Sequence, residues 1–270
     1  MLIKLLKYEL RSTLKIFAGL WIAVLALAAV NRFTLNSFQV EINGFVDFLI
    51  HILPFIVFVC VMVGMAVAAL VLLIRRFYGG LLGSEGYLMF TLPVKAWQLI
   101  TAKGIAAVII MLISSIVGIL SVLLLLKWSI IEPMVSGFFR FRFWSDTVTL
   151  TAVEAVILAI EAVIIIIVVT AKGMYKIYAA AALGHLFRKG RVGMAFVMYI
   201  AISVLGVILA GAMGEGAELF EDIASALFKD VSLFGGLNLC ALIVFVVSAV
   251  PLAVFHTVTE RILATRLNLE

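Results

Sequence analysis

The sequence predicts an all-α integral membrane protein with six transmembrane helices, preceded by an N-terminal amphipathic helix in the membrane interface. Three observations predict this: the composition, the number of long apolar runs, and the distribution of basic residues. Of the 270 residues, 66% are hydrophobic and only 13% are charged, whereas soluble domains carry about 25% charged residues. A globular core of this length could not cover so much apolar surface, but lipid can replace water as the surrounding solvent.

Six apolar runs are candidates for membrane spans. A helix that crosses a hydrocarbon core of about 30 Å needs roughly 20 apolar residues. The expected spans are about residues 16–30, 45–74, 99–126, 148–171, 192–212 and 237–258. The second is long enough to tilt or bend and contains Pro54, and the last contains Pro251. Residues 1–270 are therefore expected to form a single transmembrane domain.

The first fifteen residues have a pattern of their own. Apolar and basic residues recur at helical spacing on adjoining stripes: Ile3, Leu6, Leu10 and Leu14, and Lys4, Lys7, Arg11 and Lys15. This pattern predicts an interfacial helix with its basic side toward anionic headgroups. The alternative is a cytoplasmic extension of the first span. A basic start followed by an apolar run also resembles a signal peptide, but the basic region is long and another span follows, so the first helix is expected to stay uncleaved.

The basic residues predict the orientation. Fifteen of the twenty Lys and Arg lie at the termini, in segment 75–98 and its flanks, and in residues 172–191, and five lie in the other loops. Since cytoplasmic loops are enriched in Lys and Arg, both termini are expected in the cytoplasm of a multi-pass protein of the cell (plasma) membrane. This agreement requires an even number of spans, which favours six. The net charge of +5 is then a topology signal, and no nucleic-acid partner is expected.

The two longer outer loops differ in character. Residues 127–147 are rich in Phe and Trp, which favour the membrane interface. Residues 213–236 are acidic and contain apolar residues at helical spacing, which predicts an extracytoplasmic loop with a short amphipathic helix.

No motif for catalysis or for a cofactor is present. Cys60 and Cys240 lie inside apolar runs, His51 and His256 near the ends of such runs, and His185 in a basic loop. There is no HExxH pattern, no GxSxG, and no GxxxxGK[ST] for nucleotide phosphates. We therefore expect no metal, no cofactor bound by this chain and no enzymatic site of its own.

Two acidic residues in the fourth span are candidates for a substrate path. Glu154 and Glu161 are seven residues apart, which places them on one helix face about 10 Å apart. An ionisable group inside a membrane is costly and commonly faces a cavity or a partner. The alternatives are structural pairing with another helix or, for Glu154 near the outer end, simple solvation.

The segment between the second and third spans, Arg75–Val94, mixes glycines, aromatic residues and charges. Glycines allow turns, and aromatic side chains are favoured where one protein docks on another. A plain connection would not need Phe77, Tyr78, Tyr87 and Phe90. The composition therefore favours a docking loop.

This segment resembles the permease subunits of type-2 ABC exporters, in which forms such as F-Y-x-x-L-x-G-x-E-G-Y-L-x-F-T-L-P-V recur before Q-L-I-x-x-K, here Gln98–Lys103. The ends of the chain, Leu5–Arg11 and Arg266–Glu270, are similar to the same family's ends. The motif covers a small part of the chain, and the layout of six spans covers all of it.

The resemblance implies partners and a coupling site. In this family two permeases pair, as a homodimer or with a related chain, and separate ATPase subunits that bind ATP-Mg dock beneath them. The implied ATPase-coupling loop comprises Phe77, Tyr78, Gly83, Glu85, Gly86, Tyr87, Phe90 and Pro93. The implied cargo is an amphipathic peptide, a drug or a lipid.

Two other functions stay open from the sequence. A proton-coupled secondary transporter would use Glu161 and need no ATPase, although six spans without an inverted repeat count against it. A non-transporting membrane scaffold or sensor subunit would bind an ATPase yet move no cargo.

Overall fold

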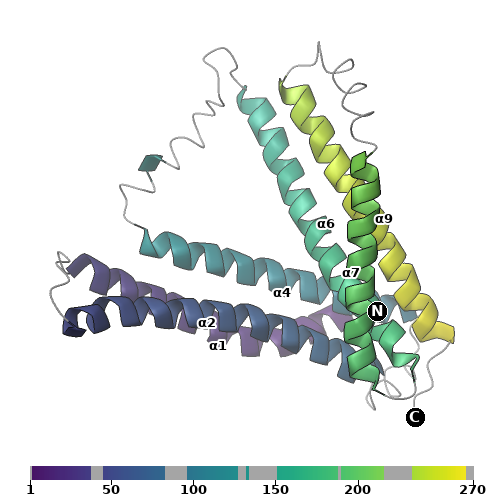
Figure 1. The fold of residues 1–270 in the computed structure, drawn as a ribbon, viewed down its shortest axis with the longest axis horizontal. Helices are drawn as coiled ribbons and strands as arrows, with labels where there is room; N and C mark the ends of the chain where they lie inside the picture. Colours follow the sequence, from purple (N-terminus) through teal and green to yellow (C-terminus); the bar gives the residue numbers. More distant parts are fainter. Residues whose placement is uncertain are drawn as a thin grey trace. The chain divides into compact units, whose positions relative to one another are not determined.

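The computed structural model describes residues 2–37, 45–82, 96–126, 132–133, 151–187, 190–215 and 233–265. Its elements, in chain order, are α1 (Leu2–Ser37), α2 (Phe45–Phe77), the π-helical turn η1 (Tyr78–Leu82), α4 (Ala96–Leu125), α6 (Ala152–His185), α7 (Arg191–Glu215) and α9 (Leu233–Thr265) (Figure 1). Among the described residues, six helices are long and apolar enough to cross a membrane. The expected six apolar helices are therefore confirmed, and the chain is a multi-pass, helical membrane protein.

The helices extend beyond the apolar runs, most clearly in α6. The expected fourth span ends at Ala171, but α6 continues to His185. Lys172, Lys176 and His185, expected in a basic loop, therefore lie on a helix. The reason is that residues 179–182 are four alanines, which have the highest helix propensity although they add little to an apolar run.

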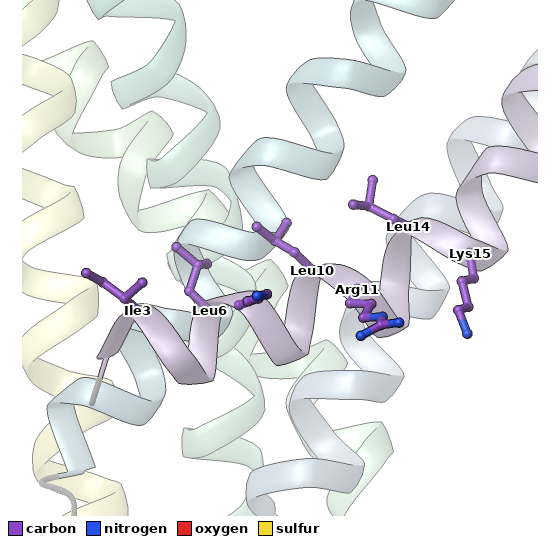
Figure 2. A pocket seen from close by; sticks show the side chains of 7 residues that line it. Ile3, Leu6, Leu10, Arg11, Leu14 and Lys15 are labelled. Atoms are coloured by element: carbon purple, nitrogen blue, oxygen red, sulfur yellow. The ribbon is translucent and has the colours of Figure 1, made fainter.

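The N-terminal segment is part of one helix rather than a separate element. α1 is continuous from Leu2 to Ser37, so there is no break after Lys15. This continuity agrees with the alternative, in which the first fifteen residues extend the first span. The amphipathic pattern is present nonetheless: Figure 2 shows leucine and isoleucine side chains on one side of the first turns of α1 and basic side chains directed away from them. They are Ile3, Leu6, Leu10 and Leu14, and Arg11 and Lys15.

The chain divides into two compact units. The first comprises residues 1–75 and 106–142, and the second comprises residues 76–105 and 143–270. The division falls inside α2 and inside α4, so each of these two helices contributes to both units.

The core of the first unit is formed by α1 with parts of α2 and α4. Phe17, Ala69 and Ile110 form one buried cluster, and a second cluster comprises Val24, Ala28, Phe58 and Met65. Trp21 packs against both clusters. Its indole Nε1 donates a hydrogen bond of 3.0 Å to Ser114 Oγ on α4, which satisfies the polar end of a ring inside an apolar core.

In the same unit, the Arg32 side chain binds the backbone carbonyl groups at the C-terminal end of α4. Its Nη1 donates to the carbonyl oxygens of Leu124 at 2.7 Å and Leu126 at 2.9 Å. The last carbonyls of a helix have no partner within it, and a cation is favourable at this end of the helix dipole. The Arg32 side chain thus ties α1 to the last turn of α4.

In the second unit, α6 packs against both α7 and α9 and contacts η1. α6 approaches α7 closely at Gly184, where a Cβ would overlap the backbone of Ala195. Small residues permit such backbone approach between membrane helices. Between α6 and α9, the Lys172 Nζ donates to Ser248 Oγ at 3.1 Å.

Substituting Gly184 by Ala is expected to destabilise the second unit by about 1–3 kcal/mol, because a helix backbone cannot move aside as a flexible side chain can. The measurement is the thermal unfolding midpoint of the purified chain in one detergent. Gly173→Ala is the matched control, since it lies on the same helix and a Cβ there meets nothing within 4 Å. Equal midpoints for the two variants would contradict the close α6–α7 contact.

Candidate functional site

The first two residues of the expected coupling loop are packed on α6. Phe77 is buried, and its ring stacks on that of Tyr178 with centroids 3.9 Å apart and planes inclined by 7°. Tyr78, the first residue of η1, lies with its ring centroid 5.9 Å from that of His185. The start of the predicted loop is therefore held against the end of α6 by two ring contacts. The other members of the predicted site lie outside the described residues: Gly83, Glu85, Gly86, Tyr87, Phe90 and Pro93.

Phe77 is one member of a larger aromatic cluster, which comprises Phe77, Tyr175, Tyr178 and His256. Tyr175 meets Tyr178 edge-on at 5.8 Å between centroids and lies 5.3 Å from the ring of His256 on α9. His256 Nε2 is 3.1 Å from Thr101 Oγ1 on α4. The aromatic cluster therefore joins the end of α2 to three other helices of the second unit.

Beside this cluster, two glycines allow side chains to pack directly against the helix backbone. A Cβ at Gly80 in η1 would lie 2.7 Å from Lys103 Nζ, and a Cβ at Gly104 in α4 would overlap the ring of Tyr175. Lys103 is only 8% exposed. A short π-helical turn often marks a functional position in a helix, and here Gly80 in that turn leaves room for the end of the Lys103 side chain.

The contacts of the described residues in this region are ring–ring and close backbone contacts, which are those of a packed junction. Sequence reasoning missed Tyr175 and Tyr178 as site residues, because residues after Ala171 were expected in a loop. It also did not bring Lys103 and His256 to this site, because their contacts depend on how α4 and α9 meet η1 and α6. The signal was present in the spacing of Tyr175 and Tyr178, three residues apart, which places both on one face of a helix. Among the described residues, no group of three His, Cys, Asp or Glu could hold a metal ion.

Glu154 has a local structural role at the start of α6. Its Oε2 accepts hydrogen bonds from the Thr151 backbone N at 2.7 Å and from Thr151 Oγ1 at 2.9 Å. The Glu154 backbone N donates in return to Thr151 Oγ1 at 3.3 Å. This reciprocal arrangement is a capping box, whose Thr-x-x-Glu spacing was readable in the sequence. The carboxylate of Glu154 is thus used in the helix cap.

Glu161 lies in a different setting, two turns further along α6. It lines a cavity of about 240 Å³ between α6 and α9, together with Asn238 and apolar side chains. Its Oε2 is buried and makes no hydrogen bond. The structure therefore brings Glu161 together with Asn238, which the sequence did not single out.

No protein-family model matches the sequence, and no curated protein or solved structure matches it. Membership of the type-2 ABC exporter permeases therefore stays a prediction that depends on the motif in residues 77–103. The function has to be inferred from the packed junction at Phe77 and from the cavity at Glu161.

A double-mutant cycle on Phe77→Leu and Tyr178→Leu is expected to be non-additive. Each change keeps an apolar side chain but removes the ring stack, which contributes about 0.5–1.5 kcal/mol beyond the buried area. Unfolding midpoints of the two single variants and the double variant in detergent give the coupling. Val169→Ala is the control partner for Phe77→Leu, since Val169 is exposed and about 13 Å along α6 from Tyr178. That pair is expected to be additive, and additivity of the Phe77–Tyr178 pair would refute the stack.

Proposed function

We propose that the chain is a membrane-spanning permease subunit of an ATP-driven exporter of the type-2 ABC class, coupled to a separate ATPase chain. The observation that carries the proposal is the segment that begins at Phe77. Its sequence resembles the coupling loop of that class, and its described start is fixed on α6 by the Phe77–Tyr178 stack. A coupling element needs such a stiff connection to pass a displacement into the membrane helices.

The mechanism that follows is a two-state one. ATP-Mg closes the ATPase pair, the docked loops of two paired permeases move with it, and the substrate path opens to the other side. In this chain the displacement enters at η1. It passes to α6 through Phe77 and Tyr78, and to α4 through the contact of Gly80 with Lys103. The partner permease is a second copy or a related chain, and the cargo is an amphipathic peptide, a drug or a lipid.

The first test is purification of the tagged chain from its native membranes in mild detergent, followed by mass spectrometry. We expect a stoichiometric ABC-type ATPase, which is lost in the Glu85→Ala/Tyr87→Ala double variant because these residues lie in the middle of the coupling motif. Tyr8→Ala and Glu132→Ala are controls: they remove an exposed aromatic ring and an exposed acid elsewhere, and should retain the ATPase. Absence of any ATPase, under conditions that keep other ABC complexes intact, would exclude the exporter.

The proposal also requires that both termini and the coupling segment face the cytoplasm of the plasma membrane. It is supported by the excess of Lys and Arg in these parts of the chain. The coupling residues could not reach an ATP-binding partner from the outer side.

Orientation is measured by labelling single cysteines with a membrane-impermeant maleimide, after Cys60 and Cys240 are replaced by Ala. In intact cells, Glu132→Cys is expected to react and Ser12→Cys to react only after permeabilisation. The two positions are exposed, so accessibility of the residue itself does not limit the reaction. The reverse pattern would place the coupling segment outside and exclude coupling to ATP.

One observation favours a second function, a proton-coupled carrier. The buried and unpartnered Oε2 of Glu161 is an arrangement in which a proton can be bound and released during transport. Such a carrier would purify without an ATPase, and a protonophore would abolish its transport. A scaffold or sensor subunit would instead retain the ATPase while purified vesicles move no cargo.

A further inference from the structure

The cavity between α6 and α9 has two polar residues, Glu161 and Asn238, in an otherwise apolar lining. We call it the Glu161 pocket; it is lined by Glu161, Ile164 and Ile165 of α6, and by Asn238, Ala241, Leu242 and Phe245 of α9. Both helices belong to the second unit and pack against each other. The pocket is therefore a feature of one helix pair.

The two polar lining residues offer hydrogen-bond acceptors. Glu161 Oε2 is buried and has no partner. Asn238 Nδ2 donates to the carbonyl oxygen of Phe234 at 2.9 Å, which leaves the Asn238 Oδ1 as an acceptor. None of the lining residues is basic, and Lys172, which also lies between α6 and α9, donates to Ser248 instead.

A pocket lined in this way selects its ligand by charge and by hydrogen bonding. A carboxylate in an apolar setting is costly unless a cation with hydrogen-bond donors is beside it. Anions are repelled, and a neutral alcohol offers one donor but no charge. Ca²⁺ and Mg²⁺ need six or more oxygen ligands, whereas Glu161 and Asn238 together supply three side-chain oxygens.

The rest of the pocket favours hydrocarbon. Ile164, Leu242 and Phe245 are partly exposed apolar side chains at its rim. A volume of about 240 Å³ is below the range of drug-sized sites, roughly 300–1,000 Å³. It suits a head group with a few carbon atoms, while a longer tail leaves across the rim.

We propose that the Glu161 pocket binds the ammonium group of an amphipathic primary amine, with the N–H groups on Glu161 and Asn238 and the hydrocarbon along Ile164, Leu242 and Phe245. This inference deepens the proposed function: the statement that the bound amine is the cargo rests on that function. It names the substrate class as amphipathic amines. Binding itself requires only this chain.

The experiment uses the full chain in phosphatidylcholine nanodiscs, with no ATPase and no nucleotide. Phosphatidylcholine has no primary amine and so does not compete. The probe is monodansylcadaverine, a primary ammonium on an aromatic body, whose fluorescence rises in an apolar site. We expect saturable binding that dodecylamine displaces and dodecanol does not.

Glu161→Gln keeps the size of the side chain and removes its charge, and is expected to weaken binding about 10- to 100-fold. Glu154→Gln is the matched control, an identical change on the same helix at a carboxylate used in the helix cap, and should bind as the unmodified chain does. Ala241→Phe fills the pocket and leaves Glu161 in place. It is expected to abolish binding, which keeps a test available if Glu161→Gln does not fold.

Three results would overturn the inference: no saturable binding by the unmodified chain, equal binding by Glu161→Gln, or equal displacement by dodecanol. Failure of the proposed function looks different, because a chain that purifies without an ATPase would still bind the probe in nanodiscs. Conversely, an ATPase partner with no probe binding would refute the amine site alone.

Discussion

The bilayer contains no water to hydrogen-bond a peptide group, and the rest of this structure depends on that constraint. Each described apolar run is a helix because a helix satisfies its own backbone. Polar side chains on the helices follow the same rule. Thr13, Thr170 and Thr259 donate to the carbonyl four residues earlier, and Arg32 donates to carbonyls at the end of α4. The composition that makes the chain insoluble in water thus leaves it few ways to fold.

Since lipid is as apolar as leucine, the helices of this chain need more than hydrophobic side chains to select their neighbours. The contacts that do so are specific: the approach of Gly184 to Ala195, the bond of Trp21 to Ser114, the bond of Lys172 to Ser248, and the stack of Phe77 on Tyr178. Leucine, valine and isoleucine side chains remain exposed along much of α6, α7 and α9, as expected for surfaces that face lipid or a partner chain.

The sequence was sufficient to predict six apolar helices, because length and apolarity are properties of the chain itself. It made Phe77 and Tyr78 candidates through aromatic composition and the family resemblance, and Glu161 through its isolated charge. It was insufficient where helix ends depend on propensity and tertiary contact. The alanines after Tyr178 carry α6 past the apolar run, so the residues that hold Phe77 were expected in a loop. Asn238 could not be linked to Glu161, since that pairing depends on how α6 meets α9. The Thr151–Glu154 cap, by contrast, was readable from local spacing.

The two regions on which the proposals rest share one helix. Tyr178 and Glu161 are seventeen residues apart on α6, about 25 Å along its axis. α6 has no proline between them, and the helix is continuous, so a displacement applied at the Phe77–Tyr178 stack has to move the Glu161 side of the pocket as well. The other side of the pocket belongs to α9, which meets the same aromatic cluster through His256. A change in the angle between α6 and α9 at the junction would therefore alter the distance between Glu161 and Asn238, and under the proposed function such a change would release a ligand from the Glu161 pocket.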